Sequence, residues 1–219
     1  MLEIKKKIHS SIKMNMIIAM PSAVGMAVLG PQLIQLLYRG DTGVLSGNLL
    51  RIGSVAIVFF AYSTMTNGIL QGIGKLRTPV IHAAVSLGIH IGMLYFMLYV
   101  LKLSVYAMVI GNVSFASIVC ILNWISIKHS VGYRQELKTS FVLPAVAAII
   151  MGVVTYGIYT GLYALLPNLL ICTVTAMLCA VVVYFVLVFL FKTLTKEELM
   201  DYPMGARIYR LSKKMKLMK

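Results

Sequence analysis

The chain has 219 residues, of which 60% are hydrophobic and only 12% are charged. A soluble domain usually carries about 25% charged residues, so this composition, with a mean hydropathy of +0.91, cannot cover a water-facing surface. The net charge of +14 lies at the ends of long uncharged stretches, which argues against nucleic-acid binding and indicates anchoring to a bilayer with anionic lipids.

The chain opens with a basic segment, residues 1–13, in which isoleucines and lysines alternate. This pattern predicts a short amphipathic helix on the cytoplasmic leaflet. The apolar run that follows is too long for the hydrophobic region of a signal peptide, so we expect it to be retained. Pro21 and Pro31 should bend this helix and free backbone carbonyls for gating or binding, although membrane helices also tolerate proline without such a role.

Apolar runs recur along the chain, each about the 20 residues that a helix needs to cross a bilayer. Only helices and closed barrels satisfy every backbone group in lipid, and continuous rather than alternating runs favour helices. The predicted fold is therefore an all-α polytopic membrane protein with six transmembrane helices. The predicted spans are Met14–Tyr38, Asn48–Gly72, Pro79–Leu101, Val105–Ile127, Phe141–Leu165 and Leu169–Phe191.

The distribution of lysine and arginine predicts the orientation of these spans. Seventeen of the 20 basic residues fall in the N-terminal segment, the second and fourth connections and the tail, and three fall on the opposite side. Because cytoplasmic loops are enriched in Lys and Arg, both termini are predicted to be cytoplasmic. We divide the chain into a basic lead-in (1–13), four helices of one lobe (14–138), a final accessory helix pair (139–192) and a basic amphipathic tail (193–219).

Polar residues within the spans are few and mostly neutral. Asn67 and Gln71 lie four residues apart on the second span and share a face. One interpretation is a polar stripe along a substrate path, and the other is a pair of interhelical hydrogen bonds beside the packing groove of Gly68 and Gly72. All six acidic residues lie outside the spans or in loops, so this segment offers no obvious proton or sodium site.

Three basic side chains in or beside the spans are further candidates. His90 and His82 lie on the third span, where a structural hydrogen bond to a neighbouring helix is favoured over a proton relay. Arg51, at the start of the second span, can reach the interface or contact an anionic substrate. No nucleophile–base pair, phosphate loop or metal-ligand spacing occurs, so we expect neither an enzyme, nor a cofactor, nor a metal site.

A longer pattern extends from Met20 to Pro79. It contains Pro21, a Gly-Pro-Gln run that begins at Gly30, and the element Leu-Gln-Gly-Ile-Gly-Lys over residues 70–75. These residues resemble the C-terminal half of the polysaccharide-type flippases of the multidrug/oligosaccharidyl-lipid/polysaccharide exporter superfamily. The branch similar to stage V sporulation protein B and to lipid II flippases fits best, and the basic tail looks similar to that branch as well.

The resemblance implies a fourteen-helix, two-lobed flippase, of which this chain would form about the last six helices. The implied function is to flip lipid-linked oligosaccharide, polysaccharide or peptidoglycan precursors across the bacterial cytoplasmic membrane by alternating access. The implied partners are the lipid-linked glycan and a missing N-terminal lobe or another copy of the chain. Two alternatives remain, half of a multidrug efflux antiporter and a non-transporting membrane scaffold. The substrate-path candidates are Asn67, Gln71, Arg51 and His90.

Overall fold

The computed structural model describes residues 2–38, 43–191 and 193. Within these residues, six helices are long and apolar enough to cross a membrane, and no strand occurs, which confirms the predicted fold class. The helices are α1 (Leu2–Leu37), α2 (Gly43–Gly72), α3 (Thr78–Tyr95), α4 (Val105–Val131), α5 (Leu143–Leu165) and α6 (Leu169–Leu190).

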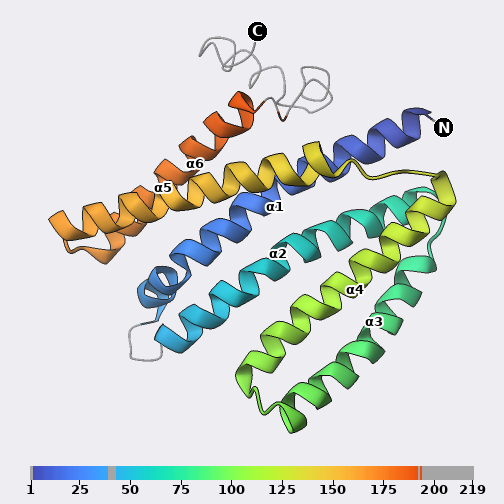
Figure 1. Ribbon diagram of the computed structural model, residues 1–219, viewed down its shortest axis with the longest axis horizontal. Coiled ribbons are helices and arrows are strands. Elements are labelled where there is room, and N and C mark those ends of the chain that lie inside the picture. Colours follow the sequence, from blue (N-terminus) through green and yellow to red (C-terminus); the bar gives the residue numbers. More distant parts are fainter. Residues whose placement is uncertain (1, 39–42, 192, 194–219) are drawn as a thin grey trace. The chain divides into compact units, whose positions relative to one another are not determined.

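The chain divides into two compact units, which we call unit 1 (Met1–Gln135) and unit 2 (Glu136–Lys219). Unit 1 contains α1 to α4, which lie side by side in the order α1, α2, α4, α3 (Figure 1). The two central helices, α2 and α4, therefore carry most of the packing in this unit, and α3 contacts mainly α4. This order brings polar side chains of α2, α3 and α4 within reach of one another.

The basic lead-in, residues 2–13, is continuous with the first span rather than separate from it. Ile8 and Ile12 are 5% and 1% exposed, so these two apolar side chains of the lead-in are buried. The His9 ring Nδ1 lies 3.3 Å from the Tyr133 hydroxyl, which joins this part of α1 to the segment after α4. Hydropathy identifies only the apolar part of a helix, which is why α1 begins before the predicted span. The predicted helix in the tail lies outside the described residues.

The α1 helix continues through both Pro21 and Pro31, and Figure 1 shows it changing direction in its last turns. The α2 helix approaches α1 closely at Gly47, where an added Cβ atom would lie only 2.8 Å from the Cα of Pro31. Such a distance leaves no room for any side chain on the α2 residue. Close contact between two helix backbones is the characteristic use of glycine in membrane packing.

The connection between α3 and α4 is short and strained. A π-helical turn, Phe96–Val100, extends α3, and Lys102 and Ser104 then adopt φ values of 50°. Non-glycine residues rarely adopt positive φ, and each such residue costs about 1–3 kcal/mol. The strain accompanies a sharp reversal that returns the chain along α4.

The described part of unit 2 is a helical hairpin. A π-helical turn, Lys138–Val142, leads into α5, and α5 and α6 pack on each other. The Asn168 side chain caps α6 by accepting a hydrogen bond from the Ile171 backbone N–H at 3.2 Å. Small residues dominate the buried face, as expected for close helix packing in lipid: Ala147, Ala148, Gly152, Cys172, Ala176 and Ala180.

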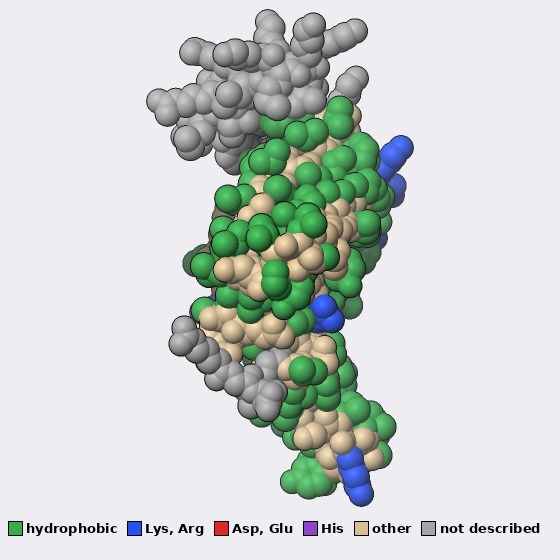
Figure 2. Space-filling model, turned by 90° about the vertical axis from the view of Figure 1, so that its left-hand side faces the viewer, with side chains coloured by type: hydrophobic (Ala, Val, Ile, Leu, Met, Phe, Trp, Pro, Cys, Tyr) green, Lys and Arg blue, Asp and Glu red, His purple; other side chains and the backbone are tan. Residues whose placement is uncertain are grey.

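Apolar side chains predominate on the exterior as well as inside. Figure 2 shows one face of the molecule, where hydrophobic side chains cover most of the surface and Lys and Arg form a few separate groups. Many exposed residues are large and aliphatic, including Val153 at 69% and Leu178 at 66% exposure. A soluble monomer rarely exposes such continuous apolar area, so this exterior is suited to a multi-pass protein surrounded by lipid.

Candidate functional site

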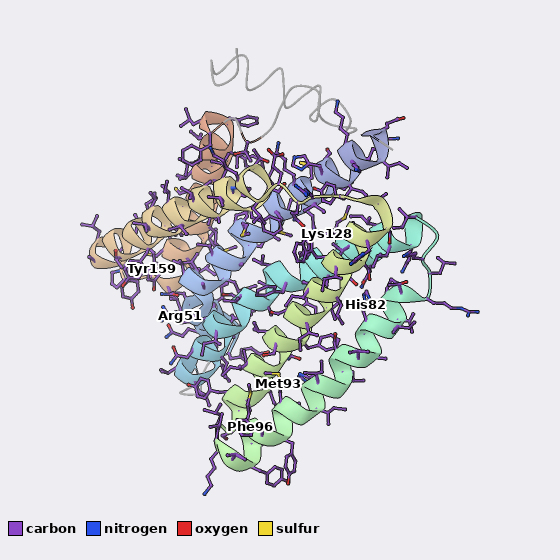
Figure 3. All side chains as sticks on the ribbon, turned by 45° about the vertical axis from the view of Figure 1, so that its right-hand side comes forward. Arg51, His82, Met93, Phe96, Lys128 and Tyr159 are labelled. Atoms are coloured by element: carbon purple, nitrogen blue, oxygen red, sulfur yellow. The ribbon has the colours of Figure 1, made fainter. Side chains whose placement is uncertain are left out.

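The α2, α3 and α4 helices meet at a buried polar cluster centred on Asn123, which is 0% exposed. The Asn123 Nδ2 donates to the Asn67 Oδ1 at 2.7 Å and to the Thr66 Oγ1 at 2.9 Å, both on α2. The Asn123 Oδ1 lies 2.7 Å from the Nδ1 of His82 on α3, and Figure 3 shows His82 on α3 beside α4. One amide thus joins three helices.

The hydrogen bonds of this cluster determine the tautomer of His82. Because the Asn123 nitrogen is the donor to α2, its oxygen must accept, so the His82 Nδ1 carries the hydrogen. The His82 Nε2 lies 3.2 Å from the Ser126 hydroxyl, which extends the cluster along α4. The hydrogen bonds of the cluster thus run without a break from α2 through Asn123 to α3. The cluster is built to hold helices together.

Asn123 and Ser126 were missed by the sequence reasoning. The available signal was an asparagine in an apolar run, followed on the same helix face by serines three and seven residues later. The Ser130 hydroxyl donates to the Ser126 carbonyl oxygen, so the polar face continues toward the end of α4. Sequence alone does not show which neighbour such a face contacts.

A second polar contact joins α3 to α4 at His90. Its Nδ1 lies 2.9 Å from the Gly111 carbonyl oxygen, and its ring packs edge-on against Phe115 with centroids 5.8 Å apart. A Cβ on Gly111 would lie 2.8 Å from the His90 Cε1, so the ring occupies the space of the missing side chain. This geometry gives His90 a packing partner, while its predicted place on a substrate path stays a prediction.

Replacing Gly111 with alanine is expected to displace the His90 ring and lengthen its hydrogen bond. Overpacking of this kind costs about 1–3 kcal/mol, and α3, which is held mainly by α4, should become the least protected helix of unit 1. Hydrogen exchange of the α3 amides in detergent micelles measures this. A Gly92→Ala variant is the control, because a Cβ there meets nothing within 4 Å. Equal protection of α3 in both variants would contradict the proposed role of the contact.

The structure separates the other predicted path residues. Asn67 is half-buried and bonds to α4, whereas Gln71 is exposed one turn later. Arg51 is also exposed, near the other end of α2 (Figure 3). Pro21 and Pro31 lie within α1, and Pro31 contacts α2 at Gly47. The structure therefore groups Asn67 with the buried cluster and leaves Gln71 and Arg51 on the surface of α2.

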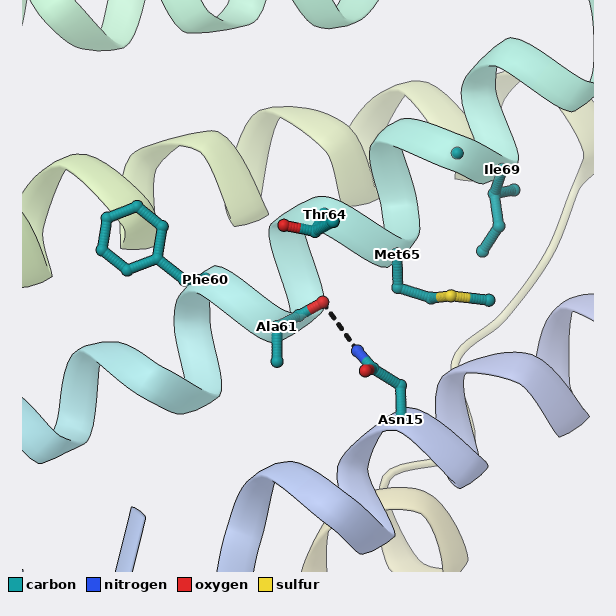
Figure 4. Close-up of a pocket in the computed structure, with 7 residues that line it drawn as sticks. Asn15, Phe60, Ala61, Thr64, Met65 and Ile69 are labelled. Atoms are coloured by element: carbon teal, nitrogen blue, oxygen red, sulfur yellow. Dashed lines mark hydrogen bonds between the residues drawn. The ribbon is translucent and has the colours of Figure 1, made fainter. Parts of the chain in front are cut away.

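An open groove of about 520 Å³ lies between α1 and α2. The Asn15 Nδ2 crosses it to donate to the Ala61 carbonyl oxygen at 2.6 Å (Figure 4). Most of the lining is apolar, with one amide and one hydroxyl. Such a surface suits an amphiphilic or hydrocarbon ligand, and no group of three metal-ligating side chains occurs among the described residues. The lining residues are Asn15, Phe60, Ala61, Thr64, Met65, Gly68 and Ile69.

Part of the chain matches a known protein family. Residues 2–96, which comprise α1, α2 and α3, match the MatE family. No curated protein and no solved structure matches the chain. The segment that forms the α1–α2 groove is therefore similar to MatE, a family of the exporter superfamily that the sequence resembles.

Proposed function

We propose that this chain is part of a transporter that flips lipid-linked oligosaccharide, polysaccharide or peptidoglycan precursors across the bacterial cytoplasmic membrane. The MatE match over α1 to α3 supports membrane transport in general. In the proposed mechanism of alternating access, the polar headgroup crosses along one face of unit 1 while the lipid tail stays in the bilayer. A second lobe or another copy completes the cavity, and no covalent bond changes.

The observation that carries this proposal is an exposed polar face on a membrane helix. Thr64, Gly68 and Gln71 are all exposed on α2, and at 100° per residue they fall within about 60° of one another. A polar side chain gains nothing from contact with hydrocarbon. Exposed amide and hydroxyl groups on one face of a membrane helix therefore favour a lining that meets a hydrated headgroup.

Multidrug efflux by cation antiport is equally compatible with the MatE match. One feature of the described residues favours flipping. Their carboxylates are Glu3 and Glu136, both exposed, and Glu3 is paired with Lys7 at 3.6 Å near the start of α1. A cation antiporter commonly keeps a carboxylate inside the membrane to bind the cation, and neither of these carboxylates is so placed.

The test uses cells depleted of their own lipid-linked glycan flippase that express the full-length protein. We expect growth to be restored by the wild type, and Gln71→Leu to reduce flipping about three- to tenfold through loss of one hydrogen bond. The matched control is Gln35→Leu, an exposed glutamine on α1 outside the groove. Accumulation of labelled glycan on the outer face measures flipping, and immunoblots confirm equal amounts in the membrane.

A parallel drug-susceptibility panel separates the alternatives. Increased drug tolerance without restored growth would overturn the flippase proposal in favour of efflux. Restored growth with the same flipping rate in the Gln71→Leu and Gln35→Leu variants would instead overturn the assignment of the path to α2.

A further inference from the structure

Exposed basic residues gather at one end of unit 1, where α1 and α3 begin and α2 and α4 end (Figure 1). We call this set the basic rim. Glu3 is the one carboxylate among the described residues of unit 1, and it already pairs with Lys7, so the rim has a net positive charge. The residues of the basic rim are Lys6, Lys7, Lys75, Arg77, Lys128 and Arg134.

The α1–α2 groove lies close to this rim. On α2 it extends from Phe60 to Ile69, a length of about 14 Å at 1.5 Å per residue. Past Ile69 the helix has one further turn, and the Lys75 N–H then bonds to the Leu70 carbonyl oxygen at 2.9 Å, which fixes the start of the next connection. Along the chain, the part of α2 that lines the groove is thus followed, toward the rim, by Gln71 and then by two cations, Lys75 and Arg77.

We propose that this surface is a binding site for an anionic phospholipid of the bilayer, with an acyl chain in the groove and the phosphate at Lys75 and Arg77. The order of side chains along α2 matches the order of groups in such a lipid. The apolar groove faces the acyl chain, the Gln71 amide faces the ester region, and the two cations face the phosphate. The groove shares Thr64 and Gly68 with the α2 face proposed for transport, so the resident acyl chain and a transported headgroup occupy this face in turn. The binding tests below use the resting protein and need no transport activity.

Energetics indicate which part of the lipid sets selectivity. An acyl chain leaves one hydrocarbon environment for another, so the groove gains packing but no hydrophobic transfer energy. Each Lys or Arg near the membrane surface contributes about 1 kcal/mol toward an anionic headgroup. The groove therefore determines whether a lipid is retained, and the basic rim determines that the lipid is anionic.

Filling the groove with a larger side chain tests whether the groove retains the lipid. Gly68 lines the groove and a Cβ there meets nothing within 4 Å, so the Gly68→Leu side chain is expected to enter the groove. Gly88→Leu on α3 is the matched control, since a Cβ there also meets open space and Gly88 lies outside the groove. In native mass spectrometry of the purified protein with dioleoyl phosphatidylglycerol, we expect the one-lipid complex to fall about tenfold in the Gly68 variant only.

Removing the cations tests whether the basic rim selects an anionic lipid. Both positions are exposed, so these substitutions should not affect folding. We expect Lys75→Gln and Arg77→Gln each to reduce the preference for phosphatidylglycerol over phosphatidylcholine about fivefold. The control is Arg51→Gln with Lys102→Gln, two exposed cations at the other end of unit 1. An unchanged preference in the rim variants, or equal loss in the controls, would overturn the site.

Competition with undecaprenyl phosphate distinguishes a resident lipid from a transported one. We expect equimolar undecaprenyl phosphate to leave most of the phosphatidylglycerol bound. Complete displacement would overturn the proposal and assign the groove to the transport substrate instead. Failure of the flippase complementation test would leave these binding results unaffected, so the two proposals can fail separately.

Discussion

Replacing Asn123 with leucine is expected to lower the free energy of unfolding by about 2–4 kcal/mol. The substitution removes the hydrogen bonds from one buried amide to Asn67, Thr66 and His82. Each interhelical bond in a membrane protein is worth only about 0.6–2 kcal/mol. The loss is larger than one such bond because the partners on α2 and α3 are left without their acceptor or donor.

The chain contains a single tryptophan, Trp124, next to the substituted residue, so its fluorescence reports unfolding in mixed micelles of sodium dodecyl sulfate and a mild detergent. Asn112→Leu is the control, because Asn112 lies on the same helix but is exposed. The free energy of unfolding of the Asn112→Leu variant should differ from that of the wild type by less than about 0.5 kcal/mol. Equal destabilisation by both variants would show that the cluster does not hold the helices.

A double-mutant cycle sharpens this test. If His82 and Asn123 act through their 2.7 Å contact, the effects of His82→Gln and Asn123→Leu should differ from additivity by about 0.5–2 kcal/mol. If the two changes in the free energy of unfolding simply add, His82 and Asn123 do not stabilise the protein through their mutual contact.

Replacing Gly47 with alanine is expected to destabilise the contact between α1 and α2 by about 1–3 kcal/mol. The added Cβ would lie 2.8 Å from the Pro31 Cα and 3.0 Å from the Pro31 Cβ. Neither atom belongs to a flexible side-chain end, so one helix must move away from the other. The measurement is the same fluorescence titration, combined with hydrogen exchange of the α1 amides.

The control for this variant is Gly25→Ala on α1, where a Cβ meets nothing within 4 Å. Alanine is a better helix former than glycine, so this substitution should raise stability by up to about 1 kcal/mol. A stabilising effect at both positions would contradict the close approach of the two helices at Pro31.

The number and type of the helices could be predicted because each depends on local composition. Lipid leaves few alternatives for a long apolar run, and α5, α6 and the end of α2 lie within a residue or two of the predicted limits. The predicted limits were wrong where a helix continues through polar sequence. Examples are the first turns of α1 and the last turn of α4, which lie outside the predicted spans. Hydropathy cannot detect these turns, because protein contacts rather than lipid cover their apolar side chains.

Pairing of polar groups could not be predicted in the same way. Asn67 and Gln71 look alike in sequence, and their spacing suggests a shared face. In the structure Asn67 is held by Asn123 of α4, whereas Gln71 is exposed. The difference arises because α4 covers one part of that face and leaves the rest open, and the position of a neighbouring helix is not a local property.

The sequence by itself determined a membrane protein of six helices, because the hydrophobic effect and backbone hydrogen bonding act on each segment separately. Its charge distribution also predicted which helix ends share a basic side. Only the tertiary structure decided that α2 and α4 are the central helices of unit 1, that Asn123 joins three helices, and that α1 and α2 form a groove near the basic rim. Those features depend on which helices touch, and close packing between residues far apart in the chain decides that.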